Sequence, residues 1–235
     1  QSTTKMLSMD EKIDELYKRI IYNAYIPQRF RSKSFENYEP NEKNEKVYKE
    51  VLNYARKFYE HYEKGGWLLM QGEYGTGKTH LAVAIIKKAA YWFAWNYAER
   101  RNNYPIDAIA TKENISPILF KNITDLLQDI KKAYNHFDVD EDQIMWKYQT
   151  KPLLIIDDLG AEKLSKQDKD NKGPSWQQEK LYSILDYRYR ELKPTVITTN
   201  YSSGELVDRV SQRVVERIQE ASHKTGFRGE SYRMN

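Results

Sequence analysis

Short aliphatic runs alternate with segments of helical periodicity along most of this chain. The runs Trp67–Met70 and Leu153–Ile156 are each four residues long, as expected for buried parallel strands. Between and beyond them, apolar residues recur every three or four positions, most clearly after Thr79, where the pattern predicts a helix facing the core (Leu81, Ala82, Ile85, Ile86, Ala89 and Ala90). This alternation predicts one α/β domain with a parallel sheet.

The same reading places the other elements. It predicts two further strands, near 117–120 and at 194–200. Further helices are expected at 9–22, 43–62, 123–135, 176–191 and 206–221, and polar loops at 96–114 and 161–174, the second mobile. The helix at 9–22 is amphipathic, and packing on the domain's own core is favoured over binding a partner. We expect a helical extension at 1–25 before the main domain at 26–235.

Composition narrows the class of protein. The chain of 235 residues has no cysteine, so disulfides and thiolate metal sites are excluded. No apolar run approaches the roughly 20 residues that span a bilayer, and the beginning of the chain lacks a signal-peptide pattern. We therefore expect a cytoplasmic protein with no membrane contact. The net charge of +4 permits nucleic-acid binding without indicating it.

A phosphate-binding pattern follows the first strand. Residues 72–79 fit G-x-x-x-x-G-K-[ST], between a predicted strand and a predicted helix (Gly72, Glu73, Tyr74, Gly75, Thr76, Gly77, Lys78 and Thr79). Backbone N–H groups in such a loop point at phosphates, at a helix N-terminus that favours anions. Lys78 would neutralise the β- and γ-phosphates, and the Thr79 hydroxyl would bind Mg²⁺. The pattern predicts a nucleoside triphosphate site.

Two acids end the strand at 153–156. Because the carboxyl ends of parallel strands face the ligand crevice, Asp157 is expected to hold Mg²⁺, in part through water. Asp158 would orient or deprotonate the attacking water. With the phosphate loop, these acids predict an enzyme that hydrolyses a nucleoside triphosphate.

The phosphate loop alone leaves GTPases, small-molecule kinases and ring-forming ATPases open. A guanine-recognising Asn-Lys-x-Asp sequence is missing, and no arginine-rich kinase lid is evident. If the helix at 206–221 is continuous, Arg209, Arg213 and Arg217 share one face. That face is either solvated or supplies an arginine to a neighbouring subunit's γ-phosphate site.

Six segments of the chain together resemble the DnaC/DnaI family of bacterial and phage replicative-helicase loaders. They are Ile-Pro-Gln-Arg-Phe-Arg at 26–31 with Phe-Glu-Asn-Tyr at 35–38, Gly-Thr-Gly-Lys-Thr-His-Leu at 75–81, Ile-Ile-Asp-Asp-Leu-Gly at 155–160, Thr-Thr-Asn at 198–200 and Gly-Glu-Ser-Tyr-Arg at 229–233. The similarity runs from residue 26 to the last residue. Transposition ATPases of the IstB kind share most of these segments, and the first pair favours a loader.

The resemblance implies an AAA+ core with a five-stranded parallel sheet flanked by helices. The 22 residues after Arg213 are too few for the C-terminal helical lid of larger relatives, so a reduced or absent lid is expected. His80 joins residues 72–79 at the nucleotide, and Phe35–Tyr38 is expected to contact adenine. Asn200 corresponds to the first sensor of the γ-phosphate, Arg213 to the arginine finger acting in trans, and Arg233 to the second sensor acting in cis.

The resemblance also implies the partners: ATP, Mg²⁺, a DnaB-type replicative helicase, single-stranded DNA and further copies of this chain in an ATP-dependent oligomer. The segment 123–146 corresponds to a helical insertion that touches single-stranded DNA, with Lys131, Lys132 and Tyr134 as candidate contacts. The second acid is Asp158 where many AAA+ proteins have glutamate, which predicts slow hydrolysis that acts as a timing switch. An IstB-type helper that binds duplex DNA is the alternative.

Overall fold

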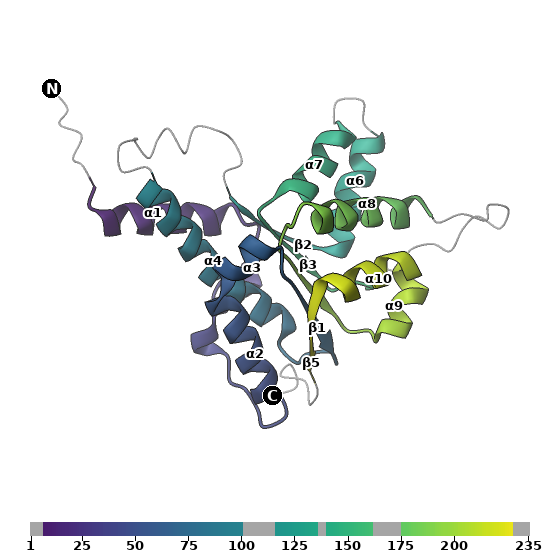
Figure 1. Cartoon of the computed structure of the whole chain (residues 1–235), viewed down its shortest axis with the longest axis horizontal. Coiled ribbons are helices and arrows are strands. Elements are labelled where there is room, and N and C mark those ends of the chain that lie inside the picture. Colours follow the sequence, from purple (N-terminus) through teal and green to yellow (C-terminus); the bar gives the residue numbers. More distant parts are fainter. Residues whose placement is uncertain (1–6, 101–115, 136–139, 162–174, 228–235) are drawn as a thin grey trace.

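The chain folds as three layers, with a parallel sheet between two groups of helices (Figure 1). The computed structural model describes residues 7–100, 116–135, 140–161 and 175–227. The five strands are ordered β2-β3-β4-β1-β5 and all pair in parallel. They are β1 (Trp67–Gly72), β2 (Ile118–Asn122), β3 (Leu153–Asp157), β4 (Thr195–Thr199) and β5 (Ser222–Phe227).

Four of these strands lie within about two residues of their predicted positions, and the fifth was missed. β5 reads Ser-His-Lys-Thr-Gly-Phe, without an aliphatic run, because it is an edge strand with only Thr225 and Phe227 buried. It pairs with β1 along its whole length, and its helix connection from β4 completes the predicted five-stranded sheet. The expected parallel α/β core is confirmed.

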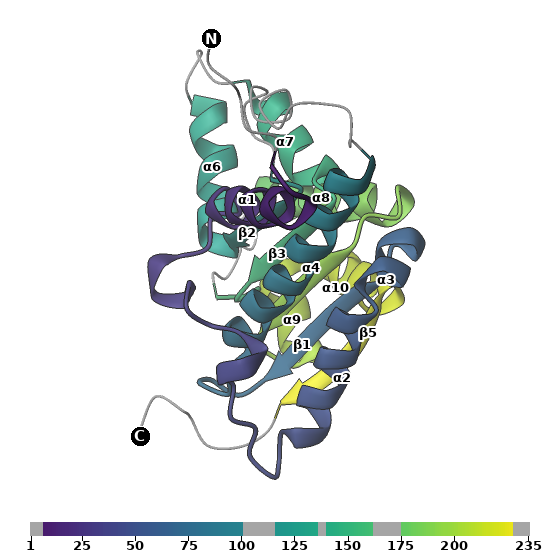
Figure 2. The same cartoon turned by 90° about the vertical axis from the view of Figure 1, so that its left-hand side faces the viewer.

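Four helices cover one face of the sheet: α1 (Met9–Tyr22), α2 (Glu45–Arg56), α3 (Phe58–Lys64) and α4 (Lys78–Arg100). Figure 2 shows them together in front of the strands. The start of α1 is set by a capping box between Ser8 and Glu11. Its side chains Ile13, Leu16 and Ile20 are buried in the same core as those of α4, so the predicted packing of this helix on the domain is confirmed. The domain boundary at residue 25 stays a prediction.

The second group of helices covers the opposite face. It comprises α6 (Ile123–Asn135), α7 (Glu141–Thr150), α8 (Trp176–Arg190), α9 (Ser203–Val210) and α10 (Gln212–Ala221). Alternate strand residues, such as Leu69, Ile156 and Ile197, pack against these helices, whereas their neighbours face α4. The strands are therefore buried on both faces, which explains their continuous aliphatic runs.

Two predicted helices are each divided into two. The helix expected at 43–62 is interrupted at Lys57, and the break brings Phe58 against Trp92 and Phe93 of α4, with ring centroids 5.6 and 5.7 Å away. Tyr59, in the first turn of α3, is 54% exposed. Gly65, with a φ of 67°, ends α3.

The helix expected at 206–221 breaks at Ser211, whose φ is 122°. Ser211 caps α10 by accepting a hydrogen bond from the Val214 N–H. The prediction that Arg209, Arg213 and Arg217 share one helical face is therefore wrong, because Arg209 belongs to α9 and the other two to α10.

The predicted loops fall largely outside the described residues. α4 continues to Arg100, so the excursion expected at 96–114 begins later than predicted, and 101–115 are not described. Of the loop expected at 161–174, only Ala161 is described. Among the described residues, no helix has the length and apolarity that a bilayer crossing needs.

Arg188 of α8 is a charged side chain buried within the second group of helices. It is fully buried, and its guanidinium donates to the Thr195 hydroxyl and to four backbone carbonyls (Tyr148, Gln149, Lys151 and Pro194). Burial lowers the pKa of Arg188 to about 9, so the group remains charged at neutral pH. It ties the end of α7 to the beginnings of β3 and β4.

Arg188→Met should therefore lower the free energy of unfolding by about 3–5 kcal/mol, because several buried acceptors lose their donor. Arg190→Met, two residues along the same helix and 62% exposed, is the matched control and should change it by less than about 0.5 kcal/mol. Urea unfolding of both variants measures the difference. Equal stability of the two would contradict the structural role of Arg188.

Candidate nucleotide-binding site

A cavity of about 660 Å³ lies at the carboxyl ends of the parallel strands. The register places Asn122 opposite Asp157, and β1 and β4 end beside them, so the polar residues after each strand meet at one edge. The lining residues come from five segments of the chain: Arg29, Phe30, Lys33, Tyr74, Gly75, Gly77, Lys78, Thr79, His80, Asn122, Asp157, Asp158, Thr198 and Asn200. Most residues singled out in the sequence for nucleotide chemistry therefore share one cavity.

The phosphate loop joins β1 to α4 and is held from behind by Tyr38. Gly77 has a φ of 87°, and a Cβ atom there would lie 2.5 Å from the Tyr38 ring, so only glycine fits. The Tyr38 hydroxyl donates to the Thr76 carbonyl at 3.1 Å. Phe35 and Tyr38 are both buried, and neither lines the cavity. The adenine contact expected from Phe35–Tyr38 has no support in this geometry.

Lys78 places its ammonium group at the centre of the loop. Its Nζ atom donates to the carbonyls of Gly72, at 2.9 Å, and Glu73, at 2.6 Å. The side chain is 6% exposed, and it extends from the first residue of α4 toward the loop that precedes it. A buried cation in a glycine-rich loop at a helix N-terminus is suited to bind phosphate.

Asp157 is nearly buried and is bonded to two hydroxyls. Thr79 donates to its two carboxylate oxygens at 3.0 and 3.2 Å, and Thr198 donates to Oδ1 at 2.7 Å. Burial raises the pKa of Asp157, against the effect of these two hydrogen bonds. A carboxylate and a threonine hydroxyl in contact are oxygen ligands of the kind that Mg²⁺ takes beside substrate phosphates. The residues present fit the predicted ion.

Asp158 and Asn200 face each other across the same edge. The Asn200 amide Nδ2 donates to the Asp158 Oδ1 atom. Asp158 has a φ of 60°, an uncommon conformation for a residue with a side chain, and its backbone N–H donates to the Thr198 hydroxyl at 2.8 Å. Thr198 therefore supports both acids. Thr198 belongs to the Thr-Thr-Asn segment at 198–200 that carries the resemblance, but a role was predicted there for Asn200 alone.

Residues before the phosphate loop complete the cavity. Arg29 and Phe30 lie in a short 3-10 helix (Gln28–Phe30) and Lys33 follows it. His80 lines the same wall, and its Nε2 atom lies 2.8 Å from the Ser34 carbonyl oxygen. Burial lowers the pKa of His80, so the ring is neutral at pH 7. The positions of Arg29 and Lys33 in the cavity wall depend on tertiary packing and were not predicted. Arg29 belongs to the segment 26–31 that carries the loader resemblance.

Arg213 does not line the cavity of its own chain. Its guanidinium carbon lies 4.1 Å from the centroid of the Tyr182 ring on α8. Arg217 instead pairs with Asp186, at 3.1 Å, and Glu220, at 2.8 Å. A role for Arg213 at a neighbouring subunit therefore stays a prediction, and Arg233 lies outside the described residues.

The curated relatives of the chain include replicative helicase loaders, whereas no family model matches it. The replicative helicase loader DnaI of Bacillus subtilis is 24% identical over 198 residues, which are 83% of this chain and 53% of that protein. The replicative helicase loader DnaC of Escherichia coli K12 is 23% identical over 186 residues, 79% of this chain and 62% of that protein. The chain thus spans between half and two thirds of the length of these relatives.

Solved structures agree. The crystal structure of the DnaC helicase loader superposes with a TM-score of 0.62 and 26% identity, over 86% of this chain and 100% of that one. The chain resembles the DnaC/DnaI-type replicative helicase loaders in both sequence and fold. AMPPCP-bound DnaA of Aquifex aeolicus shares the fold, with a TM-score of 0.57 and 19% identity over 83% of this chain and 49% of that one.

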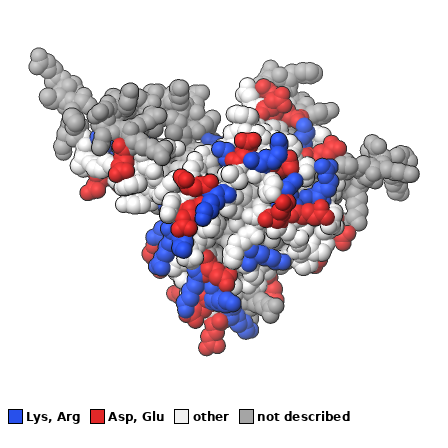
Figure 3. Space-filling model, viewed as in Figure 1, with Lys and Arg blue, Asp and Glu red and all other residues white. Residues whose placement is uncertain are grey.

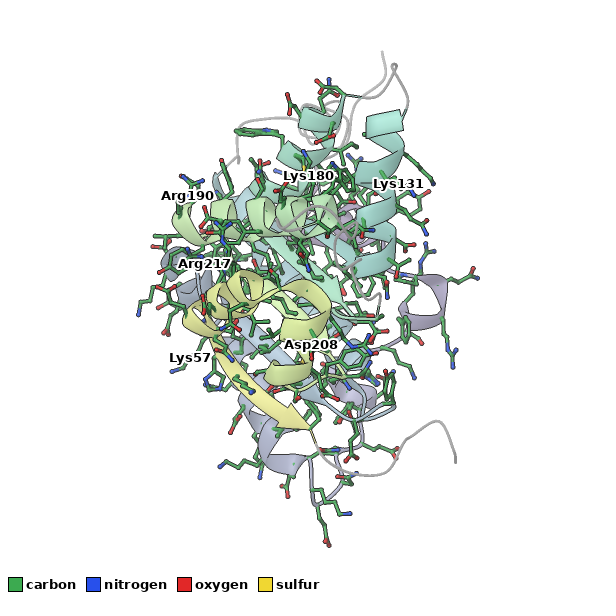
Figure 4. The ribbon with its side chains drawn as sticks, turned by 90° about the vertical axis from the view of Figure 1, so that its right-hand side faces the viewer. Lys57, Lys131, Lys180, Arg190, Asp208 and Arg217 are labelled. Carbon is green, nitrogen blue, oxygen red and sulfur yellow. The ribbon has the colours of Figure 1, made fainter. Side chains whose placement is uncertain are left out.

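These neighbours confirm the predicted P-loop AAA+ core. Within that fold, the helices α6 and α7 occupy the segment predicted to touch DNA, 123–146. Lys131 and Lys132 are exposed on α6, and Lys131 lies on the side of the molecule away from α10 (Figure 4). The side chain of Tyr134 is outside the description, and all three contacts stay predictions.

The buried charge of Asp157 provides a test of the site without any ligand. Because the folded pKa is raised, ionised Asp157 lowers stability at neutral pH, and this cost disappears as the pH falls toward the unfolded value of about 4. Asp157→Asn should raise the nucleotide-free unfolding midpoint at pH 7 and raise it by progressively less at lower pH. Asp208→Asn, on α9 (Figure 4), is the control. A lower midpoint for Asp157→Asn at pH 7 would contradict the burial cost.

Proposed function

We propose that this cavity binds ATP with Mg²⁺ and hydrolyses it. The observation that carries the proposal is the convergence of Lys78, Thr79, Asp157, Asp158 and Asn200 on one cavity at the carboxyl edge of a parallel sheet. These residues come from three separate stretches of sequence. Their types match a phosphate clamp, a metal site and a water-activating pair.

Each residue has a distinct role in this proposal. Lys78 balances the charge of the β- and γ-phosphates from the centre of the loop, while Thr79 and Asp157 hold Mg²⁺, which would neutralise charge on the phosphate oxygens. Asp158 accepts a proton from the attacking water, and Asn200, bonded to that carboxylate, fixes its direction. Asp158 has one methylene fewer than glutamate, which is consistent with slow turnover.

Hydrolysis is assigned to contacts between copies of the chain. Arg213 lies on α10, away from the cavity of its own chain, and is stacked on Tyr182 at the surface of the helical layer. An arginine that reaches a neighbour's γ-phosphate would stabilise the transition state and couple turnover to assembly. The protein is therefore proposed to form an ATP-dependent homo-oligomer.

The proposed biological role is to load a hexameric replicative helicase of the DnaB type onto DNA, with binding of single-stranded DNA by the oligomer. The similarity to DnaI and DnaC loaders in sequence and fold supports this role. Charge does not indicate the DNA surface, because acidic and basic side chains are interspersed over the face seen in Figure 3. Release of the helicase would follow hydrolysis.

Helicase loading is tested on covalently closed circular single-stranded DNA, onto which a closed ring cannot thread. The replicative helicase of the same host is added with or without this protein and ATP, and unwinding of an annealed labelled strand is measured. Unwinding that requires both this protein and ATP is expected. If the helicase unwinds equally well without the protein, or not at all with it, the loader role is wrong.

A further inference from the structure

A hydrogen bond between two tyrosines crosses the rim of the nucleotide cavity. The Tyr74 hydroxyl donates to the Tyr201 hydroxyl at 3.0 Å. Tyr74 belongs to the phosphate loop and lines the cavity, with 58% of its side chain exposed. Tyr201 follows Asn200 directly, so the bond joins the phosphate loop to the segment after β4.

Arg209 packs behind this pair. Its guanidinium carbon lies 3.7 Å from the centroid of the Tyr201 ring, and its NH1 atom donates to the Gly160 carbonyl at 2.8 Å. Gly160, with a φ of 89°, allows this close packing, because a Cβ atom there would lie 2.9 Å from the Tyr201 ring. The Tyr201 carbonyl also accepts a bond from the Gln71 side chain.

These contacts connect the phosphate loop, the segment after β3 and the helix α9. Gly160 comes two residues after Asp158, and Arg209 is in the last turn of α9. After Val210 the chain turns at Ser211 into α10, where Arg213 lies near the beginning. Arg209 therefore lies between Tyr201 and the junction from which α10 starts.

The Tyr74 hydroxyl has one proton and can donate it to one acceptor at a time. In the structure the acceptor is Tyr201. A terminal phosphate bound between Lys78 and Asn200 would be a charged, stronger acceptor on the same cavity wall. The pKa of Tyr74 is raised by its bond to Tyr201, by burial and by the nearby charge of Asp158, so this hydroxyl already lies within the electrostatic influence of the acid at the catalytic edge.

We propose that Tyr74, Tyr201 and Arg209 are positioning residues that couple the presence of a γ-phosphate to the position of α9 and α10. With triphosphate bound, Tyr74 donates to the phosphate, Tyr201 is released, and Arg209 and the α9–α10 junction shift; with diphosphate, the tyrosine bond is kept. The inference rests on the proposed ATP site. It adds a route by which that site sets the position of Arg213.

Hydrogen exchange at residues 203–221 tests the link without requiring hydrolysis. Exchange is measured by mass spectrometry on the full chain saturated with MgADP or with a non-hydrolysable ATP analogue and Mg²⁺. The wild-type protein should show about a 10-fold difference in exchange rate between the two nucleotides, the size of a typical coupling free energy. Tyr201→Phe should lose most of that difference while binding both nucleotides within about 2-fold of wild type. Tyr74→Phe should also lose most of the difference, and it should bind MgADP within about 2-fold of wild type but the ATP analogue more weakly, because its hydroxyl no longer donates to the terminal phosphate.

Two further variants separate the link from general disturbance. Arg209→Gln should keep nucleotide binding yet lose the difference at α9 and α10, and Tyr59→Phe, exposed on α3, should behave as wild type. The double variant Tyr74→Phe/Tyr201→Phe should lose no more than either single variant, because both remove the same bond. The inference is overturned if wild type binds both nucleotides with identical exchange at 203–221, or if the tyrosine variants keep the difference. If neither nucleotide binds, the proposed function itself fails.

Discussion

Lys78→Ala is expected to abolish binding of ATP, with a loss of affinity on the order of 100-fold or more. The Lys78 ammonium is held at the centre of the phosphate loop by the Gly72 and Glu73 carbonyls, within reach of any bound phosphate. A charge-assisted contact to a doubly charged group in a largely buried position is worth several kcal/mol. The affinity is measured by titration with a fluorescent ATP analogue in the presence of Mg²⁺.

The control for Lys78→Ala is Lys49→Ala, which removes an equal charge from an exposed pair with Glu45 on α2. It should leave the affinity unchanged. Circular dichroism of both variants checks that the loop change has not unfolded the domain. An Lys78→Ala variant that is folded and binds the analogue as wild type does would contradict the assignment of the cavity.

Arg213→Ala is expected to bind ATP within about 2-fold of wild type and to lose DNA-stimulated turnover by about 10³-fold. The reason is position: Arg213 lies away from its own cavity, so it cannot contribute to binding there, whereas an arginine finger supplied in trans is worth about 10³ to 10⁵ in rate. Arg190→Ala, exposed on α8, is the matched control. Phosphate release at saturating ATP and single-stranded DNA gives the rate.

Mixing two inactive variants tests the trans arrangement directly. Lys78→Ala keeps an intact Arg213, and Arg213→Ala keeps an intact cavity, so mixed oligomers contain some interfaces with both. Turnover should reappear on mixing and reach a maximum at intermediate ratios. A mixture with no more activity than its parts, or an Arg213→Ala variant with wild-type turnover, would rule out a finger in trans.

The nucleotide site was predictable because its residues lie next to elements with strong local patterns. Lys78 and Thr79 stand at a strand-to-helix junction, and Asp157 ends an aliphatic run, so neighbouring residues alone fixed their positions. The role of Thr198 was not predicted, because its position in a buried strand gives no sign that its hydroxyl contacts both acids. The Tyr74–Tyr201 hydrogen bond could not be predicted either, because the two residues are 127 positions apart. No sequence pattern assigns a partner to either hydroxyl.

Element breaks were the other failure. The apolar periodicity continues from α9 into α10, so it predicts one continuous helix. It does not reveal that Ser211 adopts a positive φ and caps a new helix. Because of this error, Arg209 was predicted to lie on the same helical face as Arg213. In the structure Arg209 packs on Tyr201 at the cavity rim, whereas Arg213 packs on Tyr182 from α10. β5 was not predicted because an edge strand needs few apolar residues. Its pairing with β1 stabilises it instead.

The central claim, an ATP-dependent DNA-replication protein, is tested most directly by fluorescence anisotropy of labelled DNA. Single-stranded and duplex oligonucleotides of equal length are titrated with the protein in MgATP or MgADP, with Lys78→Ala as the control for nucleotide dependence. The account predicts tighter binding to the single strand that requires ATP and is lost in Lys78→Ala. Tighter binding to the duplex, or binding that is the same with ATP, ADP and Lys78→Ala, would contradict it.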